Sequence, residues 1–377
     1  MKNLAELLRA NADSYREKVH QEFFLDHPEA RQIFSLSMKS THLELAGGLA
    51  WFLERCDHWG TPSPAALERV RRLGVDHRRH GFPPETYAQF ATYLIRGLDL
   101  FDLSPSDRVS AEKAVGMASA AMREAATEAD KAGVAPAHQA RVIEVDHPNR
   151  ETATIRLETA MPLAYHPGQY FSVTTSLIQG RWVHLAAAAP PNLAGQLEFH
   201  VQASASGEME AAGVLKRAKL GDSWTFGEPR GTFPRAAADV FLCFGTGWAM
   251  VRSHLVGLVD ATAGQPKWTS AVYAHALSPG QHYDAATQDN LSRLGLSLTR
   301  LVGSNTDPWL LGAKGQAPSC TVTDNPVATV IEREGTGKRF VLVGPAAQVD
   351  KAAAQLKAAG ATDVETHPWA TGRAWNH

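Results

Sequence analysis

Among the 16 histidines of the chain, His77 stands out because of its neighbours. It lies in the segment RRLGVDHRRHGFPPETY, near the predicted end of one helix, and Pro84, Glu85 and Tyr87 open the next helix. An imidazole can bind a metal or carry a proton, although a lone helical histidine is most often an ordinary surface or packing residue. These neighbours distinguish His77 from the other histidines of the chain.

Two other places contain residue types that suit a phosphate group. After the apolar run VFLCF, the turn Gly245-Thr246-Gly247 would let backbone N–H groups approach an anion at the start of a helix. A lone Gly-x-Gly turn is a weak motif, because a tight strand-to-helix turn needs the same glycines. Arg181, in the run RWVH, carries a planar guanidinium that pairs well with phosphate oxygens.

The elements that must position these residues fall into three stretches, of which the first is helical. Apolar residues recur at helical spacing, as in Leu4 and Leu8 and then Tyr15, Val19 and Phe23. Prolines at positions 62, 64, 83, 84 and 105 stand where helices start or connect. We therefore predict an all-α domain over residues 1–135.

The second and third stretches are β and α/β in character. Short runs such as ARVIEV, TATIRL, GQYFSVTT and LEFHVQA are separated by turn residues, which predicts an antiparallel β-barrel over residues 136–236. Over residues 237–377, strands, glycine turns and helices alternate, as in VFLCFGTG followed by WAMVRSHLVGLV. This alternation predicts a parallel sheet with helices on both faces.

The composition excludes several classes of protein. Of 377 residues, 37 are basic and 39 acidic, so the formal charge of −2 provides no basic field for nucleic acid or an anionic membrane. Cys56, Cys243 and Cys320 are too far apart for a CxxC metal site and too few for a disulfide framework. No apolar run approaches the roughly 18–20 residues that span a bilayer. We expect a soluble, cytoplasmic monomer with no nucleic-acid partner.

The order of the domains and the residues around His77 resemble the flavohaemoglobins, which join a globin domain, a ferredoxin-reductase-like FAD barrel and a nicotinamide-binding α/β domain. The similarity extends over essentially the whole chain and is strongest in the first 125 residues. It includes HPEARQIF and His77-x6-Pro84-Glu85-x-Tyr87. The resemblance implies haem b as a cofactor, with Phe34 packed on the haem and His77 as the proximal iron ligand.

On the proximal side, the family has a glutamate on the last helix that accepts a hydrogen bond from the histidine and is itself bonded to a tyrosine. Such an acceptor fixes the ring and increases electron donation to the metal. Tyr87 takes the tyrosine position, and we assign the glutamate to Glu124, with Glu128 as the alternative. The competing interpretation is that Tyr87 packs in the core and Glu124 is solvated. Arg78 and Arg79 form either a solvated helix end or contacts to the haem propionates.

On the distal side, His20 takes the position where the family usually has a tyrosine that donates to bound dioxygen. We expect His20 to contact the iron-bound ligand, either as a donor or by occupying the sixth iron position. A slip of the helix by one residue would instead turn His20 to solvent. The second distal position, often a glutamine in the family, falls among Thr41, His42 and Glu44.

For the barrel, the resemblance implies FAD. Tyr170, in HPGQYFSV, would lie against the cofactor. The family's Arg-x-Tyr-Ser run appears here as Arg181-Trp182-Val183-His184. Arg181 remains for the pyrophosphate, Val183 replaces the tyrosine that packs on the isoalloxazine, and His184 can donate in place of the serine.

Other reductase motifs are altered. Segment 206–211 (SGEMEA) brings two acidic residues to the expected FAD phosphate, which counts against tight binding. The turn 245–247 lacks the family's following threonine and proline, and Trp248 would occupy space beside a nicotinamide. The aromatic residue that covers the flavin in the family corresponds to Trp369 or Trp375. Use of NAD(P)H is therefore an expectation from the resemblance alone.

The resemblance implies a nitric oxide dioxygenase that converts nitric oxide and dioxygen to nitrate at haem, with electrons from NAD(P)H passing through FAD. The altered motifs favour two alternatives. One is a haem-based gas-binding or sensing protein with a degenerate reductase half. The other is a haem–flavin oxidoreductase that uses a donor other than NAD(P)H.

Overall fold

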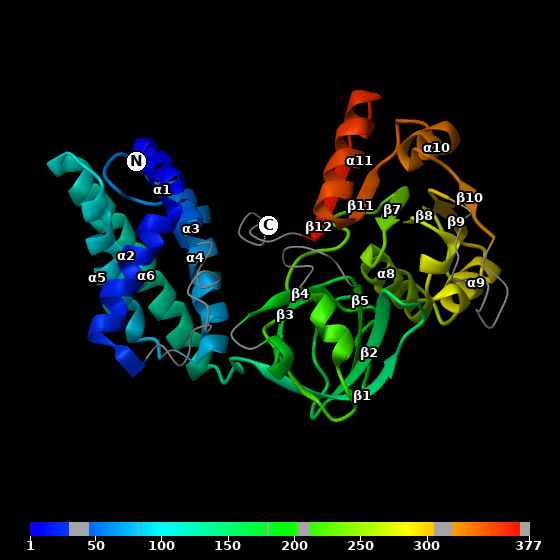
Figure 1. Cartoon of the computed structure of the whole chain (residues 1–377), viewed down its shortest axis with the longest axis horizontal. Helices are drawn as coiled ribbons and strands as arrows, with labels where there is room; N and C mark the ends of the chain where they lie inside the picture. Colours follow the sequence, from blue (N-terminus) through cyan, green and yellow to red (C-terminus); the bar gives the residue numbers. More distant parts are fainter. Residues whose placement is uncertain (30–44, 82, 179–180, 203–211, 305–318, 370–377) are drawn as a thin grey trace. The chain divides into compact units, whose positions relative to one another are not determined.

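A computed structural model describes residues 1–29, 45–81, 83–178, 181–202, 212–304 and 319–369. The chain forms two compact units, a helical one over Met1–His138 and a second one that begins at Gln139 and holds two sheets (Figure 1). The predicted order of helical, antiparallel β and parallel α/β parts is confirmed. No helix in the described ranges is both long and apolar enough to cross a bilayer.

The first unit contains six α-helices among its described residues. They are α1 (Lys2–Ala10), α2 (Ala12–Asp26), α3 (Leu45–Leu53), α4 (Pro64–His77), α5 (Thr86–Gly97) and α6 (Pro105–Lys131), with short 3-10 helices at Arg78–His80 and Leu98–Leu100. Two of the predicted prolines stand at helix starts, where a preceding serine caps the helix: Ser63 Oγ accepts from Ala66 N, and Ser104 Oγ accepts from Asp107 N.

Helices α4 and α6 lie very close together at Gly74. A Cβ atom on Gly74 would lie 2.4 Å from the Met122 carbonyl oxygen, so only glycine lets the two backbones come this close. The buried side of α6 consists largely of alanines, which keep the seam narrow. This seam holds the end of α4, where His77 lies.

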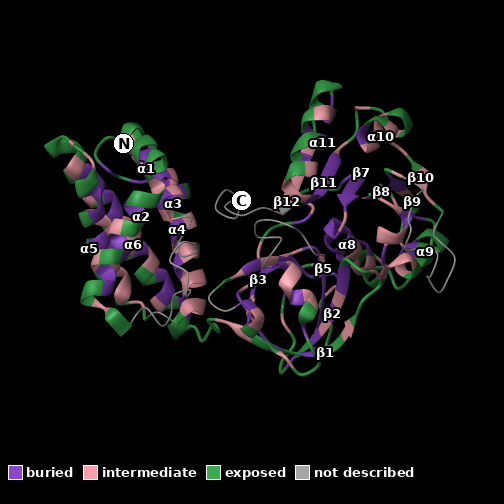
Figure 2. Ribbon diagram, in the orientation of Figure 1, coloured by how far each residue is buried: buried purple, intermediate pink, exposed green. Residues whose placement is uncertain are grey.

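The antiparallel sheet of the second unit forms around an aromatic core. Its strands are β1 (His138–Asp146), β2 (Thr152–Thr159), β3 (Tyr170–Thr175), β4 (Val183–Ala186), β5 (Gln196–Gln202) and β6 (Ser223–Phe226), in the order β4-β3-β6-β1-β2-β5. Phe171, Phe199, Trp224 and Phe226 are buried together inside the sheet. Figure 2 shows buried stretches along β2, β3 and β5 and exposed segments where the chain turns at the edge of this sheet.

The parallel sheet has its helices on both faces, as predicted. Its strands are β7 (Val240–Phe244), β8 (Ala271–Ala276), β9 (Ser297–Val302), β10 (Thr321–Val322), β11 (Phe340–Pro345) and β12 (Val364–Trp369), in the order β10-β9-β8-β7-β11-β12. Phe241 and Cys243 pack toward α8 (Gly247–Ala261) and α9 (Ala285–Arg293). Val240 and Leu242 pack toward α10 (Pro326–Glu334) and α11 (Ala346–Ala358). Cys243 is thus a buried core residue.

Candidate functional site

His77 is the last residue of α4, and its ring is half-buried. Its Nδ1 lies 3.0 Å from the Leu73 carbonyl oxygen, and because a carbonyl only accepts, Nδ1 must carry the proton. Burial, with a contribution from the charge of Arg79, lowers the pKa of His77 to about 4, so the ring is neutral near pH 7. A neutral imidazole protonated at Nδ1 has its lone pair on Nε2, where a metal would bind.

The structure does not bring Tyr87 and Glu124 together, so the prediction of this pair is wrong. Tyr87 donates to the Gly74 carbonyl oxygen at 3.0 Å, which satisfies one of the last carbonyls of α4. Glu124 and Glu128 lie outside the buried stripe of α6, and both bind Arg71, at 2.8 and 2.5 Å. The acceptor for His77 is therefore a neutral carbonyl where we expected a carboxylate.

The two arginines after His77 do not form a solvated helix end, which removes that alternative. The Arg78 side chain is 5% exposed, and it donates to Asp130 Oδ1 at 2.8 Å and to the Val134 carbonyl oxygen at 2.5 Å. The Arg79 side chain is 11% exposed and forms an ion pair with Asp76. Both cations are thus held inside the protein, beside the candidate metal ligand.

His20, on α2, is fully buried, which excludes the solvent-facing alternative. Its Nδ1 lies 2.8 Å from the Arg16 carbonyl oxygen and must donate to it. Burial lowers the pKa of His20, so the ring is neutral and its Nε2 carries a lone pair. In this state Nε2 accepts a hydrogen bond or binds a metal. Of the two predicted roles, this tautomer counts against donation from Nε2 to bound dioxygen.

The register of β3 and β4 decides which residues face a flavin. Val183 pairs with Val173 and packs in the barrel core, so the prediction of Val183 as a cofactor-binding position does not fit the structure. Side chains alternate along a strand, so Trp182 and His184 belong to the opposite, outer face. There the rings of Tyr170 and His184 meet edge to face with centroids 5.4 Å apart.

The outer face of β3 and β4 has features that fit a flavin. Ser172 Oγ is buried and has no hydrogen-bond partner among the described residues, and Ser172 stands opposite His184 in the sheet. An orphaned hydroxyl of this kind needs a polar partner, which a flavin ring edge can supply. Arg181, the predicted pyrophosphate partner, has an exposed side chain. These residues are compatible with bound FAD.

The glycines of the turn 245–247 are required by the fold itself. Gly245 has φ +53°, and a Cβ atom there would lie 2.6 Å from Gln202 Oε1. A Cβ atom on Gly247 would lie 2.3 Å from the Val343 carbonyl oxygen. Thr246 is 5% exposed. Packing therefore explains the glycines of this turn without a bound dinucleotide. This agrees with the alternative interpretation of the motif, a tight strand-to-helix turn.

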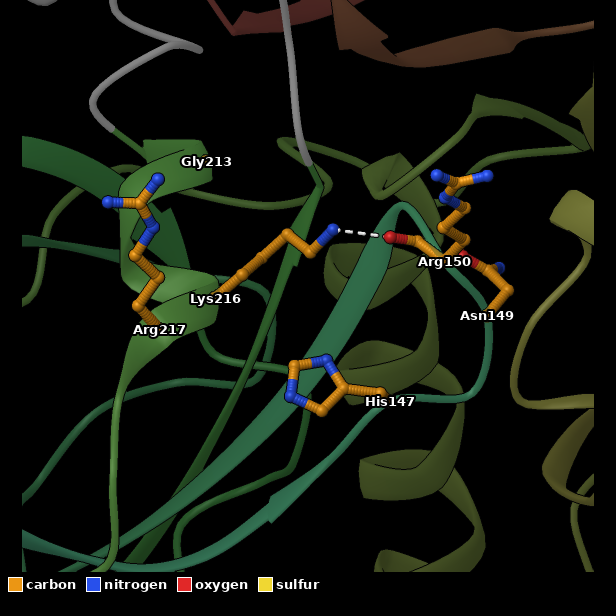
Figure 3. A pocket seen from close by; sticks show the side chains of 6 residues that line it. All are labelled: His147, Asn149, Arg150, Gly213, Lys216 and Arg217. Carbon is orange, nitrogen blue, oxygen red and sulfur yellow. Dashed lines mark hydrogen bonds between the residues drawn. The ribbon is translucent and has the colours of Figure 1, made fainter.

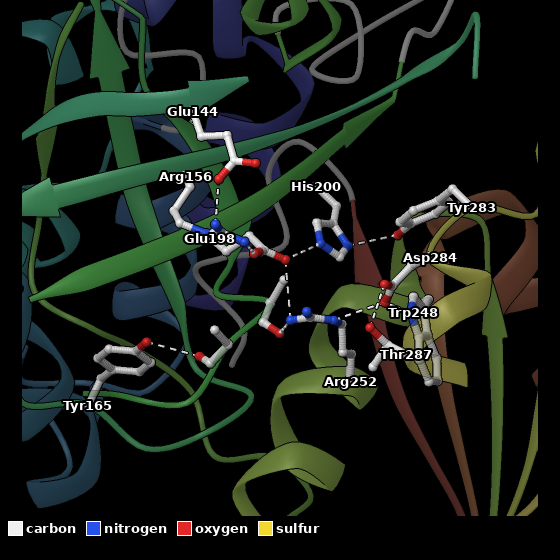
Figure 4. Close-up of polar contacts among 12 residues, drawn as sticks. Glu144, Arg156, Tyr165, Glu198, His200, Trp248, Arg252, Tyr283, Asp284 and Thr287 are labelled. Atoms are coloured by element: carbon white, nitrogen blue, oxygen red, sulfur yellow. Dashed lines mark hydrogen bonds and ion pairs between the residues drawn. The ribbon is translucent and has the colours of Figure 1, made fainter. Parts of the chain in front are cut away.

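Trp248 belongs to a buried polar network that joins β5 of the barrel to α8 (Figure 4). Its Nε1 donates to Asp284 Oδ2 at 2.8 Å, and Arg252 Nε lies 2.9 Å from the same oxygen. Arg252 also reaches Glu198 Oε1 at 3.2 Å. Trp248 thus contributes to the core, while its indole N–H anchors the loop before α9.

Glu198 is the centre of this network, and the sequence analysis missed it. His200 Nε2 lies 2.9 Å from Glu198 Oε1, and His200 Nδ1 lies 3.1 Å from the Tyr283 hydroxyl. Burial by itself would raise the pKa of Glu198, but the hydrogen bond with His200 and the charge of Arg252 hold it at about 2. The signal in the sequence was an acid and a histidine two apart in the apolar strand LEFHVQ.

A separate groove of about 450 Å³ lies between the β1–β2 turn and residues 213–217 (Figure 3). It is lined by His147, Asn149, Arg150, Gly213, Lys216 and Arg217. Most of its cationic side chains are exposed, and the Lys216 amine donates to the Arg150 carbonyl oxygen at 2.6 Å. A solvated basic surface explains this groove, and we assign no ligand to it.

Several predicted positions lie outside the described residues: Phe34, Thr41, His42, Glu44, Trp375 and segment 206–211. Trp369 is the last residue of β12 and pairs with Pro345 at the end of β11. Within the described ranges, no cluster of three or more His, Cys, Asp or Glu side chains is placed to hold a metal ion.

Comparisons with known proteins agree with this arrangement. Residues 139–234 match the family model of the oxidoreductase FAD-binding domain. No curated protein sequence matches the chain. A flavohaemoglobin from Malassezia yamatoensis, solved with FAD and haem, covers 97% of this chain and 95% of its own, with a TM-score of 0.71 and 15% identity. A cytochrome P450 reductase from Amycolatopsis covers 63% of this chain and 70% of its own, with a TM-score of 0.51 and 20% identity.

These comparisons confirm the predicted resemblance at the level of the fold, and they confirm the prediction of an oxidoreductase. They also support FAD as a cofactor through the matched domain.

Proposed function

We propose that this chain is a haem- and flavin-dependent nitric oxide dioxygenase. The proposal is supported by its oxidoreductase FAD-binding domain and by a fold similar to that of a flavohaemoglobin along its length. The net reaction is NO + O₂ + e⁻ → NO₃⁻. In this proposal NAD(P)H is the source of the electrons, and FAD, when bound to the barrel, would supply the conversion of two-electron to one-electron transfer. The helical unit is then a globin domain that supplies the site for dioxygen.

The observation that carries the proposal is the geometry of His77. Its Nδ1 proton is held by the Leu73 carbonyl, which fixes the tautomer and leaves the Nε2 lone pair for iron. The half-buried ring stands at the end of a helix that Tyr87 and the close contact at Gly74 hold in place. Haem, when bound there, would supply reversible binding of dioxygen and one-electron redox chemistry.

The protein's own residues have three roles in this proposal. His77 holds the metal and orients it, while His20 places an acceptor nitrogen inside the helical unit. In the barrel, the outer face with Tyr170, Ser172 and His184 binds and orients the flavin ring. In this proposal the second unit would hold the flavin and the helical unit would hold the haem, as in proteins that join a reductase to a haem domain.

The test is nitric oxide consumption by the full chain, reconstituted with hemin and FAD, in air with NADH or NADPH. We expect consumption well above that of free hemin, with nitrate as the product. A His77→Ala variant that retains its FAD should consume nitric oxide no faster than free hemin. Equal rates for the wild type and this variant would contradict the proposal.

A second candidate is a haem–flavin oxidoreductase with another electron donor. It is favoured by the turn 245–247, whose glycines are explained by contacts with Gln202 and Val343, and by Trp248, which is anchored to Asp284. Anaerobic titration of the flavin distinguishes the two functions. If dithionite bleaches the flavin band and neither NADH nor NADPH does, the second candidate is favoured.

A further inference from the structure

Two buried cations follow the candidate metal ligand directly in the sequence. Arginine is seldom buried unless it is paired. Both Arg78 and Arg79 are paired here, with Asp130 and Asp76 respectively. Arg78 Nη1 is also buried and has no hydrogen-bond partner among the described residues. The chain has therefore placed two guanidinium groups where water screens their charge poorly.

The anions that pair with these cations are not buried equally. Asp76 is 10% exposed, like its partner, but Asp130 is 49% exposed while Arg78 is only 5% exposed. Water screens the charge of Asp130 far more than that of Arg78. The two pairs together therefore leave a net positive field inside the end of α4.

This field reaches the His77 ring. Arg78 and Arg79 follow His77 directly, in the 3-10 helix Arg78–His80, whose His80 ring meets the His77 ring edge to face with centroids 5.6 Å apart. The other nearby acids do not offset it, because Glu124 and Glu128 are exposed and bind Arg71 one and a half turns earlier on α4. The hydrogen bond from His77 also ends on a neutral carbonyl, which increases electron donation less than a carboxylate would.

We propose that Arg78 and Arg79 are positioning residues that set the reduction potential of iron bound to His77 and favour its reduced state. The inference rests on the proposed haem ligation by His77. Reduction removes one positive charge from the metal, so a positive field nearby stabilises the reduced form. The neutral acceptor at Leu73 acts in the same direction.

The experiment is a spectroelectrochemical titration of the hemin- and FAD-loaded full chain, read at the Soret band. Arg78→Leu leaves the negative charge of Asp130, so we expect the ferric form to gain about tenfold, a shift of 59 mV downward for one electron. Asp130→Asn leaves the positive charge of Arg78 and should shift the potential upward. Arg79→Leu should lower it, and Arg79→Lys should restore most of the wild-type value.

Arg71→Leu is the matched control, because it removes an arginine that also pairs with acids on α6 but is more exposed, 29% against 5% for Arg78. We expect it to leave the potential unchanged. A role in structure alone would move Arg78→Leu and Asp130→Asn in the same direction, so shifts of the same sign would overturn the inference. No shift in either variant, or an equal shift in Arg71→Leu, would also overturn it. If Arg78→Leu does not fold, Asp130→Asn still decides, since it changes a half-exposed side chain.

Failure of the proposed function gives a different result. If His77→Ala keeps the wild-type Soret band, iron is not bound by His77 and the proposed function itself fails. If the band depends on His77 but the potentials do not move, only the inference about the arginines fails.

Discussion

The end of α4 in the helical unit and the glycine turn in the second unit were both predicted from short motifs, and the structure treats them in opposite ways. At the end of α4, hydrogen bonds within the helix fix the His77 ring and leave Nε2 available for a ligand. At the turn 245–247, packing requires both glycines, because a Cβ atom on Gly245 would lie too close to Gln202 and one on Gly247 too close to Val343. The indole N–H of Trp248, next to the turn, is already bonded to the Asp284 carboxylate.

The difference teaches how a motif should be weighed. A motif supports a binding site when the fold leaves its polar atoms without another task, as it does at His77 and Ser172. When packing needs the same residues, the motif is explained without a ligand. Variants can test this contrast between residues with an atom available to a ligand and residues that the packing of the fold requires.

The largest effect is expected in the network around Glu198. Arg252→Leu leaves Glu198 and Asp284 without their buried cation, so it should destabilise the second unit by about 3–5 kcal/mol. Urea unfolding of the full chain, followed by tryptophan fluorescence, measures the change. Arg156→Leu is the control, since Arg156 also pairs with Glu198 but is 42% exposed and should contribute only about 0–1 kcal/mol. Equal losses would mean that burial of the cation does not matter here.

The second effect concerns pH. The pKa of Glu198 is about 2 in the folded chain against an ordinary 4.5, so its ionised form stabilises the fold above pH 4.5. This stabilisation, about 3 kcal/mol, is lost as the pH falls from 4.5 toward 2. Glu198→Gln should be less stable than the wild type at pH 7 and should lack this part of the acid dependence. Parallel stability curves for the two proteins between pH 5 and 2 would contradict the assignment.

A third effect distinguishes packing from cofactor binding at the turn. Gly247→Ala places a Cβ atom 2.3 Å from the Val343 carbonyl oxygen, so the second unit should lose about 1–3 kcal/mol without any dinucleotide present. Gly337→Ala meets nothing within 4 Å and should change stability by less than about 0.5 kcal/mol. A stable Gly247→Ala variant that has lost only NAD(P)H binding would return the turn to its predicted role.

The smallest effect is expected for Tyr87→Phe. It removes one hydrogen bond to the Gly74 carbonyl and should cost about 1 kcal/mol of stability in the helical unit. Nitric oxide consumption should change little, because Tyr87 does not contact a carboxylate that acts on His77. Tyr93→Phe, on the same helix, removes a bond to Asp26 and serves as the control. A loss of 10–100-fold in activity confined to Tyr87→Phe would restore the predicted relay.

Much of the fold could be predicted, because hydrophobic periodicity and turn residues are local signals. The three-part order, the helix starts at Pro64 and Pro105 and the strand–turn–helix unit at Val240–Ala261 all follow from such signals. The position of His77 at the end of a helix was also predictable, because the signals for that helix end lie in one short segment.

The rest depended on register and long-range packing, which spacing in the sequence does not reveal. Val183 faces the barrel core because β3 and β4 pair in a particular register, and a shift of one residue would reverse its face. Glu124 was assigned from the family's glutamate on the last helix, but the rotation of α6 turns it toward Arg71. The contact of Gly247 with Val343 joins residues almost 100 positions apart.

The central claim is that His77 holds haem in a chain that also binds flavin. The most direct test is the visible spectrum of the full chain after loading with hemin and FAD and removal of the excess, compared with His77→Ala. We predict a Soret band together with a flavin band in the wild type, and loss of only the Soret band in the variant. An identical Soret band in both proteins, or a wild type that retains no haem, would contradict the account.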